Sequence, residues 1–310
     1  MRLAGCYPGL CPNRRQKNYK NLIISNFYGV DMRITCWGSR GSTPVSGKEY
    51  LKYGGDTACL EIRSSNDDII IIDAGTGIRR LGNSLMAQKR YAYHMIFTHA
   101  HWDHVMGFPF FKPIFYGRTR LTIHKCPFHT DFAEKMLNKV MSPPSFPVNY
   151  SEIKASIEYP DACPETFSIG ALTIDPIPLS HPNGGAGYKF TENGKSFVFL
   201  TDNELGFRHG GGLTPADYLE FARGADLFIH DAEYTDEEYK ETIEWGHSTY
   251  TQALDLAIKA EVKQFGLFHL NQDRSDEGMD AIVAKCRERI KQEKIGLDCF
   301  AVAADDTYNL

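Results

Sequence analysis

The sequence of 310 residues has no uninterrupted apolar run of about 18 residues, the length that a membrane-spanning helix requires. The apolar part of the N-terminal region is short and broken by Asn26, and no small-residue cleavage site follows it. The pattern of a secretory signal peptide is therefore absent. We expect a cytoplasmic protein that does not act at a membrane.

No CxxC pair occurs among the eight cysteines, and their spacing along the chain is irregular. Disulfide frameworks are typical of short secreted chains rather than of a chain of this length. We therefore expect reduced thiols, several of them buried in strands at Cys36, Cys59 and Cys299.

Positive charge is not in excess, because 34 lysines and arginines face 39 aspartates and glutamates, which gives a net charge of −5. A broad nucleic-acid footprint needs clustered basic residues, so we expect no stable nucleic-acid complex. A small anionic substrate remains compatible with this balance, because bound cations can supply local positive charge.

Residues 1–31 carry five basic residues, one acid and little periodicity. We expect a disordered extension rather than a functional tail. Alternatively, the sequence begins at an upstream start codon that is not used. From Met32 onward, strand and helix patterns alternate without an internal repeat, which predicts one folded domain over 32–310. The proline-rich segment 141–152 could be an insertion, a lid or a loop that faces a partner, and the sequence leaves these alternatives open.

Hydrophobic periodicity and turn residues place eleven strands and five helices after Met32. The predicted strands are 33–37, 57–63, 69–73, 94–98, 121–125, 171–179, 187–191, 196–201, 226–230, 264–269 and 298–303. The predicted helices are 78–87, 131–141, 214–223, 248–261 and 276–292. Helix starts are indicated at Thr214 before a proline, at Thr249 with Gln252 in a capping box, and at Ser275 before two acids.

A cluster of polar donors follows the apolar run 95–97 in the stretch FTHAHWDHVMGFPF. His99, His101, Asp103 and His104 form the pattern H-x-H-x-D-H, and imidazole and carboxylate are the ligands that Zn²⁺, Mn²⁺ and Fe²⁺ accept. Buried polar groups without partners would cost several kcal/mol, so the cluster predicts metal binding. Four donors on one loop cannot all reach one ion without strain, which favours two neighbouring ions.

Three further donors end predicted strands elsewhere in the chain. His181 ends LTIDPIPLSH, Asp202 ends SFVFLTD and His269 ends FGLFH. Each signal is weak alone, since an aspartate after a strand is commonly a turn residue. Together with the loop they supply seven donors, the number needed for two ions that share one carboxylate.

This order and spacing of donors resembles the metallo-β-lactamase superfamily, and the resemblance extends from about Met32 to the C-terminus. It implies an α/β fold, an αββα sandwich of two mixed β-sheets with helices on the outer faces, and a catalytic domain over 32–310. It also implies two divalent ions, for which we expect Zn²⁺, with Mn²⁺ or Fe²⁺ as alternatives. The implied ligands are His99, His101 and His181 for one ion and Asp103, His104 and His269 for the other, with Asp202 bridging them.

Asp73, in IIDAGTG, matches the aspartate that orients the histidine loop in that superfamily. A turn residue before Gly75 and Gly77 is an equally good interpretation. Trp102 and Phe108 flank the donor loop; packing is the expected role, and stacking on a base is the alternative.

The segment FIHDAEYTDEEYKETIEWGHSTY (228–250) resembles ribonuclease Z and its relatives. His230, Asp231 and Ala232 match a His-acid-Ala motif in which ribonuclease Z has Glu in place of Asp. Glu233 and Tyr234 depart from that motif. The following HST motif is matched in full at 247–249.

Cleavage of a phosphodiester expels an alkoxide that needs a proton, and a histidine beside a carboxylate can donate it near neutral pH. We therefore predict that Asp231 and His247 are catalytic, together with Asp103 of the metal set. The alternatives are a turn-capping role for Asp231 and a surface position for His247. The predicted substrate-binding residues are Arg40, in a glycine loop, and Ser248 and Thr249, at a helix start where backbone N–H groups can face a phosphate.

Only 21 positions separate His181 from Asp202, which fits a hairpin and leaves no room for the arm that tRNA-trimming ribonuclease Z carries there. The stretch CWGSRGSTPVSGKEYLKYGGDTACLEI (36–62) is similar to a branch with cyclic-nucleotide phosphodiesterases, among them phage enzymes that degrade bacterial defence signals. Hydrolysis of a cyclic mononucleotide to a linear one, by water that the ions activate, is therefore the leading hypothesis. The alternatives are a hydrolase of another ester or of RNA 3′ ends, and a metal-binding sensor without turnover. We also expect a homodimer.

Overall fold

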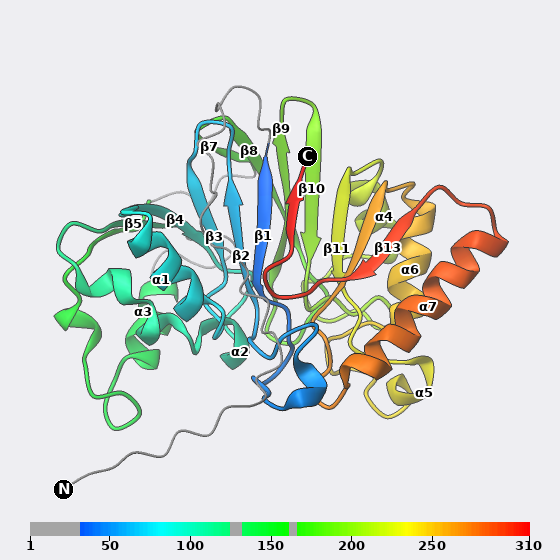
Figure 1. Cartoon of the computed structure of the whole chain (residues 1–310), viewed down its shortest axis with the longest axis horizontal. Helices are drawn as coiled ribbons and strands as arrows, with labels where there is room; N and C mark the ends of the chain where they lie inside the picture. The colour runs from blue at the N-terminus through cyan, green and yellow to red at the C-terminus, as the bar shows by residue number, and fades with distance from the viewer. Residues whose placement is uncertain (1–31, 125–131, 161–165) are drawn as a thin grey trace, which may run out of the picture.

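The computed structural model describes residues 32–124, 132–160 and 166–310. The predicted extension 1–31 lies outside the described residues. The rest forms two seven-stranded β-sheets that pack face to face, with helices on both outer sides (Figure 1). This four-layer architecture confirms the predicted αββα sandwich.

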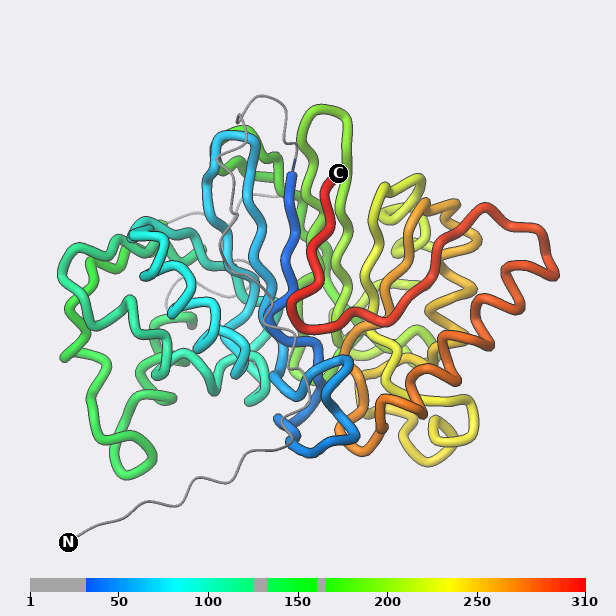
Figure 2. The backbone as a smooth tube through the Cα atoms, in the orientation of Figure 1, coloured from blue at the N-terminus to red at the C-terminus, as the bar shows by residue number. Residues whose placement is uncertain are grey.

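The first sheet is antiparallel at one side and parallel at the other. Its strands, in spatial order, are β14 (Thr307–Asn309), β1 (Arg33–Gly38), β2 (Cys59–Arg63), β3 (Ile69–Ile72), β4 (Ala92–Ile96), β5 (Arg120–His124) and β6 (Ser156–Glu158). The last strand of the chain thus pairs with the first one, as the adjacent red and blue segments of the tube show (Figure 2).

The second sheet has the same mixed design, with parallel pairs from β10 to β13 and antiparallel pairs from β7 to β10. Its strands, in spatial order, are β13 (Asp298–Ala301), β12 (Gln264–Phe268), β11 (Leu227–Asp231), β10 (Lys195–Leu200), β9 (Ala186–Glu192), β8 (Leu172–Pro178) and β7 (Phe167–Ile169). Both sheets are therefore mixed, as predicted.

Helices α1 (Ile78–Ala87) and α3 (Phe132–Val140) cover the first sheet, while α4 (Pro215–Ala222), α6 (Tyr250–Lys259) and α7 (Asp276–Gln292) cover the second (Figure 1). Two one-turn helices, α2 (Trp102–Val105) and α5 (Asp236–Tyr239), lie in loops. The 3-10 helices are η1 (Lys48–Tyr50), η2 (Phe108–Phe110), η3 (Lys112–Phe115) and η4 (Tyr150–Glu152).

Alternation along the strands sorts apolar side chains into separate layers, because successive side chains point to opposite faces of a sheet. In β10, Phe197 and Phe199 enter the core between the two sheets, whereas Val198 and Leu200 pack with the residues of the helical layer of α4, α6 and α7. Full burial of one such side chain stabilises the fold by roughly 1.5–3 kcal/mol. The sandwich is therefore specified by β-strands that are apolar on both faces.

The predicted helix starts are confirmed. The Thr214, Thr249 and Ser275 hydroxyls accept hydrogen bonds from backbone N–H groups in the first turns of α4, α6 and α7. Cys36, Cys59, Cys286 and Cys299 are buried free thiols, as expected, and the other four cysteines lie outside the described residues.

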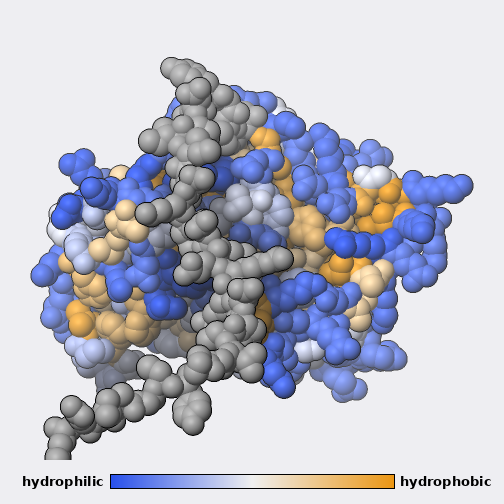
Figure 3. All heavy atoms as spheres, viewed as in Figure 1, coloured by the Kyte–Doolittle hydropathy of each residue, from blue (hydrophilic) through white to orange (hydrophobic). Residues whose placement is uncertain are grey.

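Within the described part of the chain, no helix is long and apolar enough to cross a membrane. Hydrophilic side chains predominate on the face in Figure 3, where hydrophobic side chains form only scattered patches.

Candidate metal centre

The seven predicted donors converge at one end of the sandwich, where several strands end. The donor loop 99–104 follows β4 and includes α2, and single donors follow β8, β10 and β12. Six of the seven donors are buried, and His101 is half-buried. The carboxyl ends of the strands thus bring together residues up to 170 positions apart (269 minus 99).

The first group of donors surrounds one Asp202 oxygen. The Nε2 atom of His99 lies 3.3 Å from Asp202 Oδ2, and Nε2 of His181 lies 3.7 Å from the same oxygen. The Nδ1 atom of His101 lies 2.8 Å from His181 Nε2. These four residues form one candidate ion site.

The second group uses both Asp202 oxygens. The Nε2 atom of His104 lies 3.4 Å from Oδ1, and Nε2 of His269 lies 3.4 Å from Oδ2. The Asp103 carboxylate completes the group, with Oδ2 3.2 Å from His104 Nε2 and 3.1 Å from His269 Nε2. Asp202 therefore belongs to both groups, as a bridging ligand must.

The donor set fits two divalent ions. Ligands about 2.1 Å from a tetrahedral ion lie about 3.4 Å from one another, which is close to most of the separations described above. Among the described residues, His99 Nε2 and His104 Nε2 are buried and have no hydrogen-bond partner. Two unpartnered nitrogens at the centre of a cluster are costly to bury unless a ligand binds them.

Carboxylates and histidines of the cluster shift one another's pKa values. Burial alone would lower the pKa of His104 and of His269, but the nearby carboxylates outweigh it and raise both well above their usual range, so binding of an ion to these two imidazoles would release protons. Burial alone would raise the pKa of Asp202, but His269, His104 and His99 outweigh it and hold that pKa well below its usual range. Burial lowers the pKa of His181 well below its usual range and, with the neighbouring His99, lowers that of His101 to about 4.

Asp73 lies beneath the donor loop and holds it in place. Its Oδ1 accepts from the Thr98 backbone N–H at 2.8 Å, and its Oδ2 accepts from the Thr98 hydroxyl at 2.7 Å and from His104 Nδ1 at 2.8 Å. The bond to Nδ1 leaves His104 Nε2 directed at the ion site. These contacts favour the orienting role of Asp73 over that of a turn residue.

Three polar residues at the site have left-handed backbones, with φ of 61° at Asp73, 56° at Asp202 and 54° at His269. Such conformations are uncommon in residues other than glycine and cost of order 1–3 kcal/mol each. These three residues follow the ends of β3, β10 and β12, where the chain leaves the sheets.

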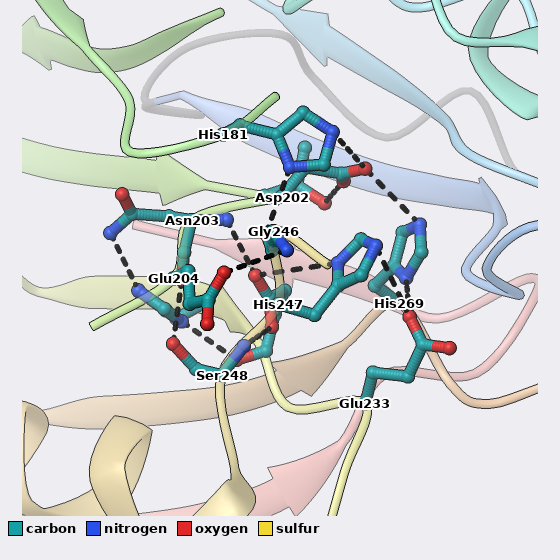
Figure 4. A network of polar contacts seen from close by, with 12 residues as sticks. His181, Asp202, Asn203, Glu204, Glu233, Gly246, His247, Ser248 and His269 are labelled. Carbon is teal, nitrogen blue, oxygen red and sulfur yellow. Dashed lines mark hydrogen bonds and ion pairs between the residues drawn. The ribbon is translucent and has the colours of Figure 1, made fainter. Parts of the chain in front are cut away.

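His247 lies against the second group of donors. Its ring stacks on that of His269, with centroids 4.4 Å apart and an interplanar angle of 20°. Its Nε2 is 3.5 Å from Glu233 Oε2, which also accepts from His269 Nδ1 at 2.8 Å (Figure 4). Burial alone would lower the pKa of His247, but the charge of Glu233 outweighs it and the pKa is raised.

The predicted pairing of His247 with Asp231 is present only as a long contact of 3.9 Å between Nδ1 and Oδ2. The Asp231 carboxylate instead accepts from two backbone N–H groups, those of Asn203 at 2.6 Å and Ser248 at 2.8 Å. Asp231 therefore fixes the loops around His247, and Glu233 is the carboxylate closer to the ring. In the sequence, the role of Glu233 was indicated only by the departure from the ribonuclease Z motif at that position.

The structure contradicts the prediction that Arg40 binds phosphate. The residue is 1% exposed, and its guanidinium donates to the carbonyl oxygens of Gly54, Asn271 and Arg274. These bonds use four of the five N–H donors of the guanidinium, and burial keeps the group away from the surface. Arg40 instead joins the loop after β1 to the loop after β12.

The backbone N–H groups of Ser248 and Thr249, which were predicted to face a phosphate, donate to the Asp231 carboxylate at 2.8 Å and to the Gln252 side-chain oxygen at 3.1 Å. The side chains of both residues are also committed within the protein, so their predicted contact with substrate is not supported. The Ser248 hydroxyl donates to the Asn203 carbonyl oxygen at 2.6 Å and accepts from the Leu205 N–H at 3.0 Å. The Thr249 hydroxyl caps α6, and both residues are buried.

Glu204, which the sequence did not indicate, is a buried carboxylate that holds the loop before His247. Its Oε1 accepts from the Tyr239 hydroxyl and the Glu244 N–H, and its Oε2 accepts from His209 Nε2 and the Gly246 N–H at 2.8 Å. The Gly246 carbonyl oxygen in turn accepts from His181 Nδ1 at 2.8 Å.

Only glycine fits at position 246, because φ is +97° and a Cβ atom would lie 2.2 Å from His181 Nδ1. The loop that carries Gly246 lies between the side chains of Glu204 and His181 and is therefore closely packed against the candidate metal centre (Figure 4).

A family model described as a beta-lactamase superfamily domain matches residues 69–270. Ribonuclease Z of Haloferax volcanii is 26% identical over 284 residues, which cover 78% of this chain and 85% of that protein. The crystal structure of the metallo-beta-lactamase fold protein YhfI from Bacillus subtilis aligns with a TM-score of 0.66 and 17% identity over 91% of this chain and 100% of its own. Unliganded yeast PDE1 aligns with the same TM-score and coverage at 14% identity. At these identities, the structural likenesses establish the fold alone.

Proposed function

The chain belongs to the β-lactamase superfamily, and we propose that it is a metal-dependent phosphodiesterase that hydrolyses a cyclic mononucleotide to a linear nucleotide. The observation that carries this proposal is His247, a buried histidine that stacks on the metal-ligand candidate His269 and lies 3.5 Å from a Glu233 carboxylate oxygen, whose charge raises the pKa of the histidine. Ester hydrolysis with a good leaving group does not need such a proton donor, whereas expulsion of a ribose alkoxide does.

The two groups of donors would hold one divalent ion each, with Asp202 shared. When bound, such a pair polarises a phosphoryl oxygen and lowers the pKa of a coordinated water to about 7. Asp73 and Glu233 set the orientation of this centre, because each accepts from the Nδ1 atom of a ligand histidine and directs the opposite nitrogen inward.

His247 supplies the proton in the proposed reaction. Its Nδ1 lies toward Asp231. Its Nε2 lies toward Glu233, on the side of the ring where His269 is placed (Figure 4). In the proposed reaction, a proton on Nε2 would pass to the leaving oxygen, and the nearby Glu233 carboxylate would stabilise the charged ring until then.

The short connection between His181 and Asp202 supports a small substrate. It consists of the hairpin of β9 and β10, with no further element between these strands. Similarity in sequence to ribonuclease Z favours a second candidate, cleavage at RNA 3′ ends. The hairpin and the net charge of −5 support the smaller substrate instead.

A substrate screen tests the proposal. Protein loaded with Zn²⁺, Mn²⁺ or Fe²⁺ is assayed on 3′,5′- and 2′,3′-cyclic mononucleotides of all four bases and on a precursor tRNA with a 3′ trailer, with Asp202→Ala as the blank. We expect turnover of at least one cyclic nucleotide, lost in the blank and reduced at least about a hundredfold in His247→Ala. Cleavage of the RNA alone would replace the proposal with the second candidate, and no turnover of any phosphodiester would reject both.

A further inference from the structure

A pocket with a volume of about 590 Å³ lies between the donor loop and α3. Ala100, Trp102 and Val105 line it from the donor loop, and Met136 and Val140 line it from α3. We infer that this pocket holds the nucleobase of the substrate, with the Trp102 indole as its stacking surface. The inference rests on the proposed function, because it assigns the position of the base to a nucleotide whose phosphate lies at the metal centre.

The exposure of Trp102 is the first reason. Its side chain is 56% exposed, whereas Phe108, the other aromatic residue beside the donor loop, is completely buried in the core. Phe108 is thus a packing residue, and Trp102 leaves much of its ring free for a ligand. Stacking of a base on an exposed aromatic ring tightens binding by about 5–150-fold.

The charge of the pocket is the second reason. Lys135 and Lys139 on α3 and the residues Ser142 and Ser145 complete the described lining, which includes no acid. An apolar floor with ammonium and hydroxyl groups suits an aromatic heterocycle that belongs to an anion. The proline-rich segment 141–152 thereby contributes residues to the wall of the pocket.

The place of the pocket is the third reason. Trp102 directly follows the ligand candidate His101, so their Cα atoms are about 3.8 Å apart. A base on Trp102 would therefore lie beside the donor loop 99–104, which carries four of the seven candidate ligands. Two other pockets, one beside α7 and β13 and one between α4 and α6, include no residue of the donor loop and are lined in part by acids.

Binding measurements separate the base from the rest of the nucleotide. Adenosine 5′-monophosphate and ribose 5-phosphate share sugar and phosphate and differ only in the base. Isothermal titration of Zn²⁺-loaded protein should show tighter binding of the nucleotide by about tenfold or more. In Trp102→Ala this difference should disappear, with the affinity for ribose 5-phosphate unchanged.

Phe110→Ala is the matched control, because Phe110 is 55% exposed and does not line the pocket. It should retain the difference in affinity, and Trp102→Phe should retain part of it. The inference is overturned if wild type shows no difference or if Trp102→Ala keeps it in full. It is also overturned if sedimentation shows that Trp102→Ala separates a dimer while the difference remains.

The two failures are distinguishable. Turnover of a cyclic nucleotide without a difference in affinity rejects the pocket and retains the proposed function. A difference in affinity that depends on Trp102, in a protein that turns over no cyclic nucleotide, rejects the function and retains a base-binding pocket.

Discussion

The imidazole rings of His247 and His269 stack with their centroids 4.4 Å apart, so the proposed proton donor lies directly against a candidate metal ligand. Glu233 links the two rings, because its Oε2 lies 2.8 Å from His269 Nδ1 and 3.5 Å from His247 Nε2. This carboxylate therefore couples the candidate metal centre to the proposed proton donor.

Glu233→Gln should lower metal affinity and turnover together. The amide keeps the shape of the side chain but loses the charge that faces both rings, and it presents an oxygen to only one of them. Loss of such a partner typically weakens metal binding about 10–100-fold. Competition with a chelating dye measures the affinity, and Glu237→Gln, an exposed glutamate on α5, is the control that should change nothing.

Asp231→Asn should act mainly on stability. Asp231 accepts two backbone N–H groups, and an amide can satisfy only one of them without placing its own N–H group against the other. We expect the free energy of unfolding to fall by about 1–3 kcal/mol in urea denaturation. A larger loss of metal affinity in Asp231→Asn than in Glu233→Gln would contradict the assignment of Glu233 as the nearer partner.

Metal binding should stabilise the protein and be stoichiometric. Mass spectrometry of the dialysed protein should show two ions per chain, and free ion at 100 times its dissociation constant should add about 2.7 kcal/mol to the free energy of unfolding for each site that it fills. Asp202→Ala loses the shared ligand and should bind fewer ions with a smaller rise in Tm. Asp255→Ala, a half-exposed aspartate on α6, should behave as wild type.

The strand ends that carry single donors could be predicted from the sequence, because an apolar strand followed by one His or Asp is a local pattern. The role of Arg40 could not, because the carbonyl groups that bind its guanidinium include those of residues 231 and 234 positions away. The choice between Asp231 and Glu233 depends on how the chain bends after β11, which spacing alone does not determine. Strands β6, β7 and β14 were missed because three residues are too few to establish periodicity.

A pair of histidines away from the metal centre should make stability depend on pH. His94 and His124 share a hydrogen bond, and burial lowers both pKa values, that of His124 from 6.5 to about 4. The unfolded chain therefore binds more protons than the folded one below pH 6.5, so stability decreases as the pH falls from about 6.5 toward 4.

His124→Phe keeps an aromatic ring against Phe167 and removes the titrating group. The loss of unfolding free energy between pH 7 and pH 5 should be smaller in this variant by about 2 kcal/mol. An equal loss in both proteins would show that the pair does not contribute.

Glu204→Gln tests whether the buried carboxylate positions His247. The amide cannot accept all four hydrogen bonds, so the loop that carries Gly246 should shift and displace the histidine ring. On a cyclic nucleotide we expect kcat to fall about a hundredfold with little change in KM, because the loss concerns proton donation rather than binding. A phosphodiester with a p-nitrophenolate leaving group needs no proton donor, so Glu204→Gln and His247→Ala should both retain near-normal activity on it. Glu220→Gln, an exposed glutamate on α4, is the control for both substrates. An equal loss on both substrates would mean that Glu204 supports the metal centre as a whole, through Gly246 and His181, and not the proton donor in particular.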